Sequence, residues 1–393
     1  MRALRRVAAL LVLSTPLLLA SAAQAVNDHA NYRAVCPAAE IDSARCAADV
    51  VTDEHGNPNA TTSPTGLGPL DFWSAYNLPA TTAGAGQTIA IVDAYDYATA
   101  ENDLNVFSSQ YSLPACTTAN GCFRKVNQNG GSNVRGYRSS SGWALEAALD
   151  IETAHGICPS CKIVLVEAQS NSFANLSTAE DTAASLGNVI SNSYGGSEFS
   201  TETTSSYDGH YNHPNRAITV SSGDSGYGAE YPATSQYVTA AGGTTLTRAS
   251  NSRGWSESAW SSAGSGCSAY EPQPSWQVGA TTGCSRRAEA DVSADADPAS
   301  GASVYDSTSY QGQTGWFKVG GTSLAAPLLA GVYALAGDAS SASYPVQRAW
   351  TNSSTFNDVA SGSNGSCGAP LCTAGTGWDG PTGWGTPWGT TGF

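Results

Sequence analysis

Strand-length apolar runs, rich in β-branched residues, alternate along this chain with segments of helical spacing. The pattern predicts strands at residues 87–93, 162–168, 188–194, 217–222 and 237–241, and helices at 98–111, 143–155 and 176–186. This alternation predicts an α/β fold with a mostly parallel central sheet, and right-handed crossovers place helices on both of its faces. In such sheets, functional residues collect in the loops beyond the carboxyl ends of the strands.

Residues 67–393 are expected to form a single catalytic-size domain, because no proline-rich linker or internal repeat interrupts them. Within this domain, residues 253–315 are rich in Gly, Ser and Trp and show little periodicity, which predicts long loops packed on the sheet. Residues 26–66 are polar, and we interpret them as a loop-like N-terminal extension along the surface.

The first 25 residues have the pattern of a secretory signal peptide. Three arginines lie among the first six residues, an apolar segment follows at 7–19, and small residues at 23–25 suit a cleavage site. The apolar segment is too short to span a bilayer comfortably, and no later run is long enough. We therefore expect a secreted, extracellular protein that is monomeric and has no membrane segment.

The charge balance is acidic, with 32 Asp and Glu against 17 Lys and Arg and a net charge of −15. Nucleic acid is therefore not an expected partner, because no basic patch is available. Only 12% of the residues are charged, about half the usual share. Acid unfolds proteins largely by protonating carboxylates that are paired in the native state, so a chain with few possible ion pairs is compatible with acidic conditions.

The ten cysteines fall in five close couples, which in an exported chain suggests five disulfides that each close a short loop. The couples are Cys36/Cys46, Cys116/Cys122, Cys158/Cys161, Cys267/Cys284 and Cys367/Cys372. Sequence alone does not fix this connectivity. The Cys158/Cys161 couple could instead be a redox or zinc half-site, although no second couple combines zinc-like spacing with a nearby histidine.

A glycine-rich turn at residues 319–321 leads through Ser323 into a long apolar segment. The glycines allow a sharp turn, and the apolar segment predicts a buried helix. A serine at such a junction is exposed to substrate near the positive end of the helix dipole, where a nucleophile is useful. A serine that merely caps a core helix explains the same residues equally well.

Glu146 and Asp150 lie four residues apart and therefore share one face of their predicted helix. A solvated surface would explain the pair, but the rest of this helix is largely apolar. Two partly buried carboxyls raise one another's pKa and can share a proton. Such a pair can act as a general base in acid, where a histidine would be protonated.

Asp224 lies in the sequence Ser222-Gly223-Asp224-Ser225-Gly226, directly after a predicted strand. A turn with an Asx hydrogen bond accounts for it structurally. A functional role is also available, because a protonated carboxyl can donate a hydrogen bond to a developing oxyanion.

Taken together, Gly321-Thr322-Ser323 with Ala326-Pro327, the Glu146/Asp150 spacing and the motif around Asp224 resemble the sedolisin family of serine-carboxyl peptidases. The resemblance covers roughly residues 67–387. It implies a subtilisin-like fold and acid-active hydrolysis of peptide bonds in proteins or peptides. It also implies that Ser323 is the nucleophile, Glu146 its general base supported by Asp150, and Asp224 a member of the oxyanion hole.

The same resemblance implies one structural calcium ion near the C-terminus. The positions that match the family's ligands are Asp358, Val359, Gly375, Gly377 and Asp379. Two carboxylates and the carbonyls of glycine-bent loops suit a hard cation that prefers oxygen ligands. The N-terminal region departs from the family pattern, because sedolisins normally carry a long prosegment. Here residues 26–66 are either a reduced prosegment or an extension that is no prosegment at all.

Two alternatives remain at this stage. Asp93, His155 and Ser323 occur in the order of a subtilisin-type triad. However, His155 lies nine residues after Glu146, which places it about opposite Glu146 on a helix with about 100° per residue. The residues after His155 also lack the subtilisin histidine pattern. The second alternative is a non-catalytic secreted binding protein on the same scaffold.

Overall fold

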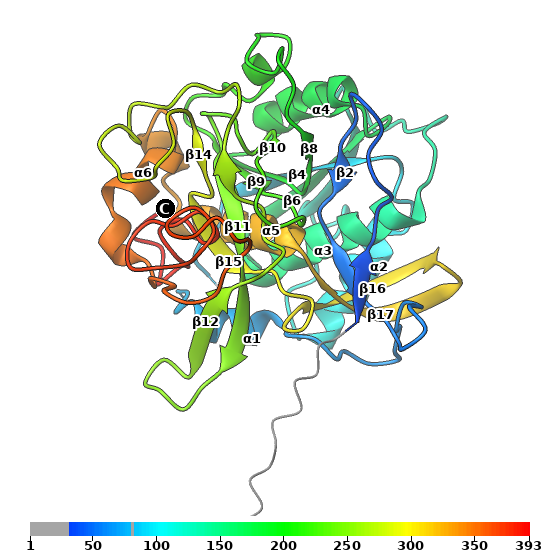
Figure 1. Cartoon of the computed structure of the whole chain (residues 1–393). Helices are drawn as coiled ribbons and strands as arrows, with labels where there is room; N and C mark the ends of the chain where they lie inside the picture. The colour runs from blue at the N-terminus through cyan, green and yellow to red at the C-terminus, as the bar shows by residue number, and fades with distance from the viewer. Residues whose placement is uncertain (1–30, 80–81) are drawn as a thin grey trace, which may run out of the picture.

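A computed structural model describes residues 31–79 and 82–393, so the predicted signal peptide lies outside the described residues. The central sheet has the strand order β12-β11-β9-β7-β4-β6-β5, with β15 also paired to β11 (Figure 1). Every pairing in it is parallel except that of β11 with β12. Its strands are β4 (Thr88–Ala94), β5 (Phe123–Asn127), β6 (Lys162–Ala168), β7 (Val189–Asn192), β9 (Ala217–Ser221), β11 (Thr239–Arg248), β12 (Trp255–Ala259) and β15 (Val292–Asp295).

Helices pack on this sheet, which confirms the predicted α/β class. The described α-helices are α1 (Pro69–Ala75), α2 (Ala100–Gln110), α3 (Ser141–Ile157), α4 (Phe173–Leu186), α5 (Thr322–Ala336) and α6 (Val346–Thr351), of which α3, α4 and α5 contact the strands of this sheet. Helices α3 and α5 pack against each other and against the sheet. Both are buried around almost their whole circumference, as expected of helices that lie inside a core. This placement brings the polar residues of α3 and the first turn of α5 into the protein interior.

The expectation of long loops at residues 253–315 was wrong in part. This region contains β12, β15, the short pair β13 (Gly266–Cys267) and β14 (Ala288–Glu289), and β16 (Ala302–Tyr310). Strand β16 forms a hairpin with β17 (Gln313–Gly320). These strands pair with partners that are distant in sequence, and periodicity within a short polar run cannot reveal such partners.

The N-terminal segment also differs from the expected loop, because residues 31–51 contain three short strands. They are β1 (Tyr32–Ala34), β2 (Arg45–Cys46) and β3 (Asp49–Val51). Strands β1 and β3 extend the β16–β17 hairpin, in the order β1-β3-β17-β16. Strand β2 pairs with β8 (Tyr194–Ser197), which also pairs with β10 (Glu230–Tyr231). In Figure 1 the blue N-terminal segment accordingly runs beside β8.

All five predicted disulfides are present with the predicted partners. Each joins cysteines no more than 17 residues apart, so each closes a local loop. Because Cys158 and Cys161 are bonded to each other, their thiolates are not available as a zinc half-site. Among the described residues, no helix is long and apolar enough to cross a bilayer.

Candidate active site

Ser323 lies in the first turn of α5, completely buried behind the glycine turn. Gly321 has a φ of 98°, in the region that favours glycine. A Cβ atom at this position would also lie 2.2 Å from the carbonyl oxygen of Ala47. The backbone N–H of Ser323 donates to the same Ala47 oxygen, at 2.9 Å. The turn therefore needs glycine so that another peptide can approach the start of α5.

Glu146 and Asp150 both lie on α3 and are fully buried. Burial raises the pKa of Glu146 well above its ordinary value, and the nearby charges of Asp150 and Asp93 raise it further. Burial likewise raises the pKa of Asp150, with a second contribution from Asp93. The hydroxyl of Ser193 donates to Asp150 Oδ1 at 2.7 Å, while Asp150 Oδ2 has no partner among the described residues.

Ser323 and Glu146 are neighbours within this cluster. The Ser323 hydroxyl donates to the Ser193 carbonyl at 3.2 Å, and the Glu146 oxygens have no partner in hydrogen-bonding geometry among the described residues. Ser323 is nevertheless close enough to lower the pKa of the Glu146 carboxyl. The Ser323 hydroxyl therefore interacts with the Glu146 carboxyl, although its hydrogen bond in this structure goes to the Ser193 carbonyl.

Asp93, on β4, belongs to the same cluster, a role that sequence reasoning missed. Its carboxyl is buried without a partner among the described residues, and it raises the pKa of both Glu146 and Asp150. Its own pKa is raised by burial and then by Glu167. Asp93, Asp150 and Glu146 thus form one group of buried carboxyls, which we call the acid cluster. The sequence signal that could have revealed this role is the position of Asp93, an acidic residue near the carboxyl end of a central strand.

Asp224 lies in the loop after β9 and faces the start of α5. The backbone N–H and the hydroxyl of Thr322 both donate to Asp224 Oδ1 at 2.8 Å. Asp224 Oδ2 is buried without a partner among the described residues, and it lies 2.6 Å from the point where a Gly321 Cβ would stand. The Ala47 oxygen lies close to that same point. Burial, and then the charge of Asp49, raise the pKa of Asp224 well above its ordinary value. A protonated Oδ2 could therefore donate to an oxygen held by the Ser323 N–H.

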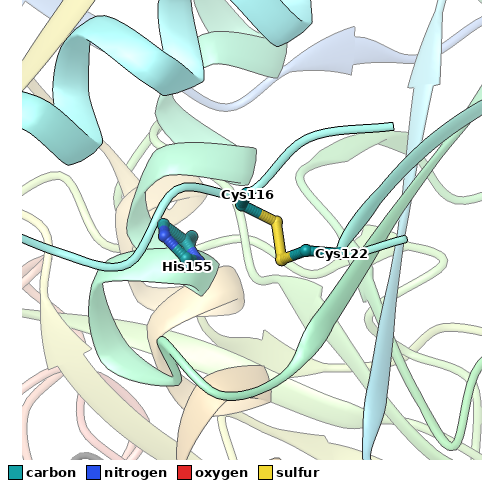
Figure 2. Close-up of side chains that lie close together, drawn as sticks. All are labelled: Cys116, Cys122 and His155. Carbon is teal, nitrogen blue, oxygen red and sulfur yellow. A yellow bond between two sulfur atoms is a disulfide. The ribbon is translucent and has the colours of Figure 1, made fainter. Parts of the chain in front are cut away.

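His155 is separated from this site, which argues against the subtilisin-type alternative. Its Nε2–H donates to the Pro114 carbonyl at 3.0 Å, and its ring lies beside the Cys116–Cys122 disulfide (Figure 2). Burial lowers the pKa of His155 to about 4. Within the described chain, His155 makes no hydrogen bond with Asp93 or Ser323. Because both sulfurs are bonded to each other, this trio also offers no thiolate for a metal.

The residues predicted to bind calcium converge at the C-terminal end of the chain. Asp358 accepts a hydrogen bond from the Gly377 N–H at 3.1 Å, and Asp379 accepts one from the Gly375 N–H at 2.9 Å. Asp379 is close enough to Asp358 for the latter's charge to raise its pKa, although burial is the larger cause. Val359 is buried next to Asp358 in sequence. Asp358 and Asp379 offer carboxylate oxygens of the kind that calcium prefers, and the hydrogen bonds place the N–H groups of Gly377 and Gly375 against them.

Comparison with known proteins agrees with this geometry. The model of the Subtilase family matches residues 126–385. The chain belongs to the subtilase family. It is 29% identical to sedolisin from Pseudomonas sp. (strain 101), over 82% of this chain and 60% of that protein. It is 31% identical to kumamolisin from Bacillus sp. (strain MN-32), over 83% of this chain and 62% of the relative. The chain thus spans about 60% of the length of these two relatives.

A solved structure supports the same assignment. Pseudomonas sedolisin, a serine-carboxyl proteinase complexed with two molecules of pseudo-iodotyrostatin, superimposes with a TM-score of 0.68 and 29% identity. The match covers 83% of this chain and 96% of that one. The resemblance to sedolisins and the subtilisin-like fold that were inferred from sequence are therefore confirmed.

The buried carboxyls predict a protein that is most stable in acid. Burial raises the pKa of Glu167 to about 7, of Glu180 to about 8 and of Glu202 to about 9. The folded state therefore binds more protons than the unfolded state, in which the pKa of a carboxyl is about 4. The stabilisation that these three carboxyls contribute is thus fully present below pH ~4. It is lost as the pH rises from there through their folded-state pKa values. We expect the melting temperature to fall by at least about 5 °C between pH 4.5 and pH 8 in calorimetry.

Glu180→Gln is a matched control for this effect, because Glu180 is fully buried on α4, outside the acid cluster. Replacing the carboxyl by an uncharged amide removes one of the titrations. The variant should lose less stability over the same pH range. A wild-type melting temperature that is constant or rises with pH would contradict the assignment of raised pKa values.

Proposed function

We propose that this protein is a secreted, acid-active serine-carboxyl endopeptidase that hydrolyses proteins or peptides. The observation that carries the proposal is the position of Ser323 beside the buried carboxyl of Glu146, where a serine protease of the subtilisin type would need a histidine. The solved structure of sedolisin, which is named a serine-carboxyl proteinase, supports this choice of chemistry.

In the proposed reaction, the Ser323 hydroxyl attacks the substrate carbonyl carbon and Glu146 accepts its proton. Asp150 and Asp93 raise the proton affinity of Glu146, so the proton is held within the acid cluster. The oxyanion receives hydrogen bonds from the Ser323 N–H and from protonated Asp224. Glu146 then returns the proton to the leaving amine, and a water molecule hydrolyses the acyl-enzyme by the same steps.

We expect this arrangement of groups to favour activity in acid. Asp224 has to be protonated to donate a hydrogen bond, and the raised pKa that burial gives it makes this form available in acid. A histidine base would be protonated and inactive there. A carboxyl base with a raised pKa accepts the serine proton better than an ordinary carboxylate does.

Replacing the nucleophile or the base should abolish hydrolysis. We expect Ser323→Ala and Glu146→Gln to lower kcat/KM on a peptide substrate at pH ~3–5 by at least about 1,000-fold. Both substitutions are close to isosteric, so melting curves at the same pH should show that folding persists. The measurement is fluorogenic peptide hydrolysis across that pH range.

Glu152→Gln is the matched control, because Glu152 is also buried on α3 but accepts a hydrogen bond from the Tyr305 N–H instead of facing Ser323. This variant should retain most of the activity.

Asp224→Ala should reduce kcat by about 100- to 1,000-fold through loss of the oxyanion donor. Full activity of the Ser323→Ala protein would refute the proposed function.

We further propose that Asp358, Val359, Gly375, Gly377 and Asp379 hold one structural calcium ion. The two aspartates would contribute carboxylate oxygens, and the other three residues would contribute backbone carbonyls. When bound, the ion would neutralise two neighbouring carboxylates and fix the C-terminal loops. It has no part in the proposed proton transfers.

Chelation is therefore expected to lower the melting temperature, by several degrees for a site saturated about 100-fold above its Kd. The measurement is a melting curve with and without a calcium chelator, followed by calcium re-addition. Asp358→Asn is the control variant, because Asp358 is exposed and its replacement removes one ligand charge without opening the core. This variant should be insensitive to the chelator. An unchanged wild-type melting curve with no calcium detected by metal analysis would count against the site.

A further inference from the structure

Two histidines approach one aspartate where helix α4 meets the segment that follows β8. Asp181 lies on α4, and His210 is the last residue of the 3₁₀ helix η1 (Asp208–His210). The Nδ1–H of His210 donates to Asp181 Oδ2 at 2.7 Å, and His213 Nε2 lies 3.2 Å from Asp181 Oδ1. Each oxygen of this carboxylate therefore faces a different imidazole. We call these three side chains the His–Asp–His cluster.

The backbone beneath this cluster is well anchored, while the side chains reach solvent. Helix η1 packs against α4, and Tyr211, which lies between the two histidines in sequence, is completely buried. Further along the segment, the Nε–H of Arg216 donates to the Ala184 carbonyl near the end of α4, at 3.0 Å. The side chains of the cluster are between 25% and 48% exposed. A small ion can therefore reach donor groups whose main chains are already held together.

The surroundings of the cluster favour a cation. Within the described chain, Asp181 forms no ion pair with a lysine or an arginine, and His213 Nε2 has no partner in hydrogen-bonding geometry. The other titratable groups of α4 and η1 are the buried acids Glu180 and Asp208. The chain as a whole carries a net charge of −15. Neither element of the cluster therefore contributes a lysine or arginine that would repel a metal ion.

We propose that Asp181, His210 and His213 bind one zinc ion at neutral pH. Imidazole nitrogens and carboxylate oxygens are ordinary zinc ligands, and three protein ligands with one water complete a tetrahedral site. The donors would be His210 Nδ1, His213 Nε2 and an oxygen of Asp181. These atoms do not all lie within 4.8 Å of one another in this structure, so binding has to turn the two partly exposed rings toward each other.

Protons and zinc compete for the two histidines. A protonated imidazole can pair with Asp181, but it has no lone pair for a metal. Histidines in general lose this proton between about pH 5 and pH 8, and their nitrogens then become metal ligands. The cluster thus joins α4 to the segment after β8 through ion pairs in acid and through zinc at neutral pH. This inference does not rest on the proposed function, because Ser323 takes no part in it.

Calorimetric titration of the full chain with zinc chloride tests the proposal, with calcium in excess to occupy any calcium site. One zinc ion per chain should bind at pH ~7.5 with a micromolar or tighter Kd, and binding should be lost at pH ~4.5 because protons displace the metal. Zinc at about 100-fold above its Kd should also raise the melting temperature at the higher pH by at least about 3 °C.

Asp181→Asn and His213→Gln should each weaken zinc binding at least about tenfold, and zinc should no longer raise their melting temperature. His55→Gln is the matched control, because His55 is also an exposed histidine beside an acid, 3.5 Å from Glu54, in a pair without a second histidine. This control should bind zinc like the wild type. Melting curves without zinc establish that the variants are folded, as expected for side chains that are partly exposed.

Three results would overturn the proposal. The first is the absence of zinc binding to the wild type at pH ~7.5, and the second is equal affinity at pH ~4.5, which would exclude histidine ligands. The third is undiminished binding by both Asp181→Asn and His213→Gln, which would mean that zinc binds adventitiously elsewhere. None of these results bears on peptide hydrolysis, which the Ser323→Ala variant tests separately.

Discussion

Desolvation of carboxyl groups is the constraint on which the rest of this site depends. A carboxylate inside a protein is costly unless it is paired, and α3 carries Glu146 and Asp150 of the acid cluster into the core with no cationic partner among the described residues. Asp93 adds a third from β4. The cluster can be buried only because it holds protons. The free-energy cost of burying charged carboxylates therefore affects both the pH dependence of stability and the proposed proton transfer.

The second requirement is a place where a peptide backbone can reach Ser323. Helix α5 begins immediately after strand β17, and Gly321 between them has no side chain to obstruct the approach. The N–H of Ser323 points out of the first turn of α5, where backbone donors lack intrahelical partners. Asp224 reaches this same point from the end of β9. The strand order of the sheet thus brings together the proposed nucleophile, base and oxyanion donor from three separate parts of the chain.

The occupation of this place by residues 45–50 gives the N-terminal region a physical reason for its structure. Its strands have two or three residues each and would not be stable alone. They are held by backbone pairing, because β2 pairs with β8 and β3 pairs with β17. A sequence that appears loop-like can therefore become ordered when neighbouring strands supply its hydrogen-bond partners.

The sequence by itself determined the α/β class, the five close cysteine couples and the residues around Ser323. These features depend on periodicity, on short separations in sequence or on compact motifs, all of which can be recognised in the amino-acid sequence. The i, i+4 spacing placed Glu146 and Asp150 on one face for the same reason. Only the tertiary structure decided that Asp93 joins this pair and that His155 faces Pro114 instead. It also decided that Ala47 lies against Ser323, because parallel pairing and edge addition join residues whose separation in sequence leaves no local trace.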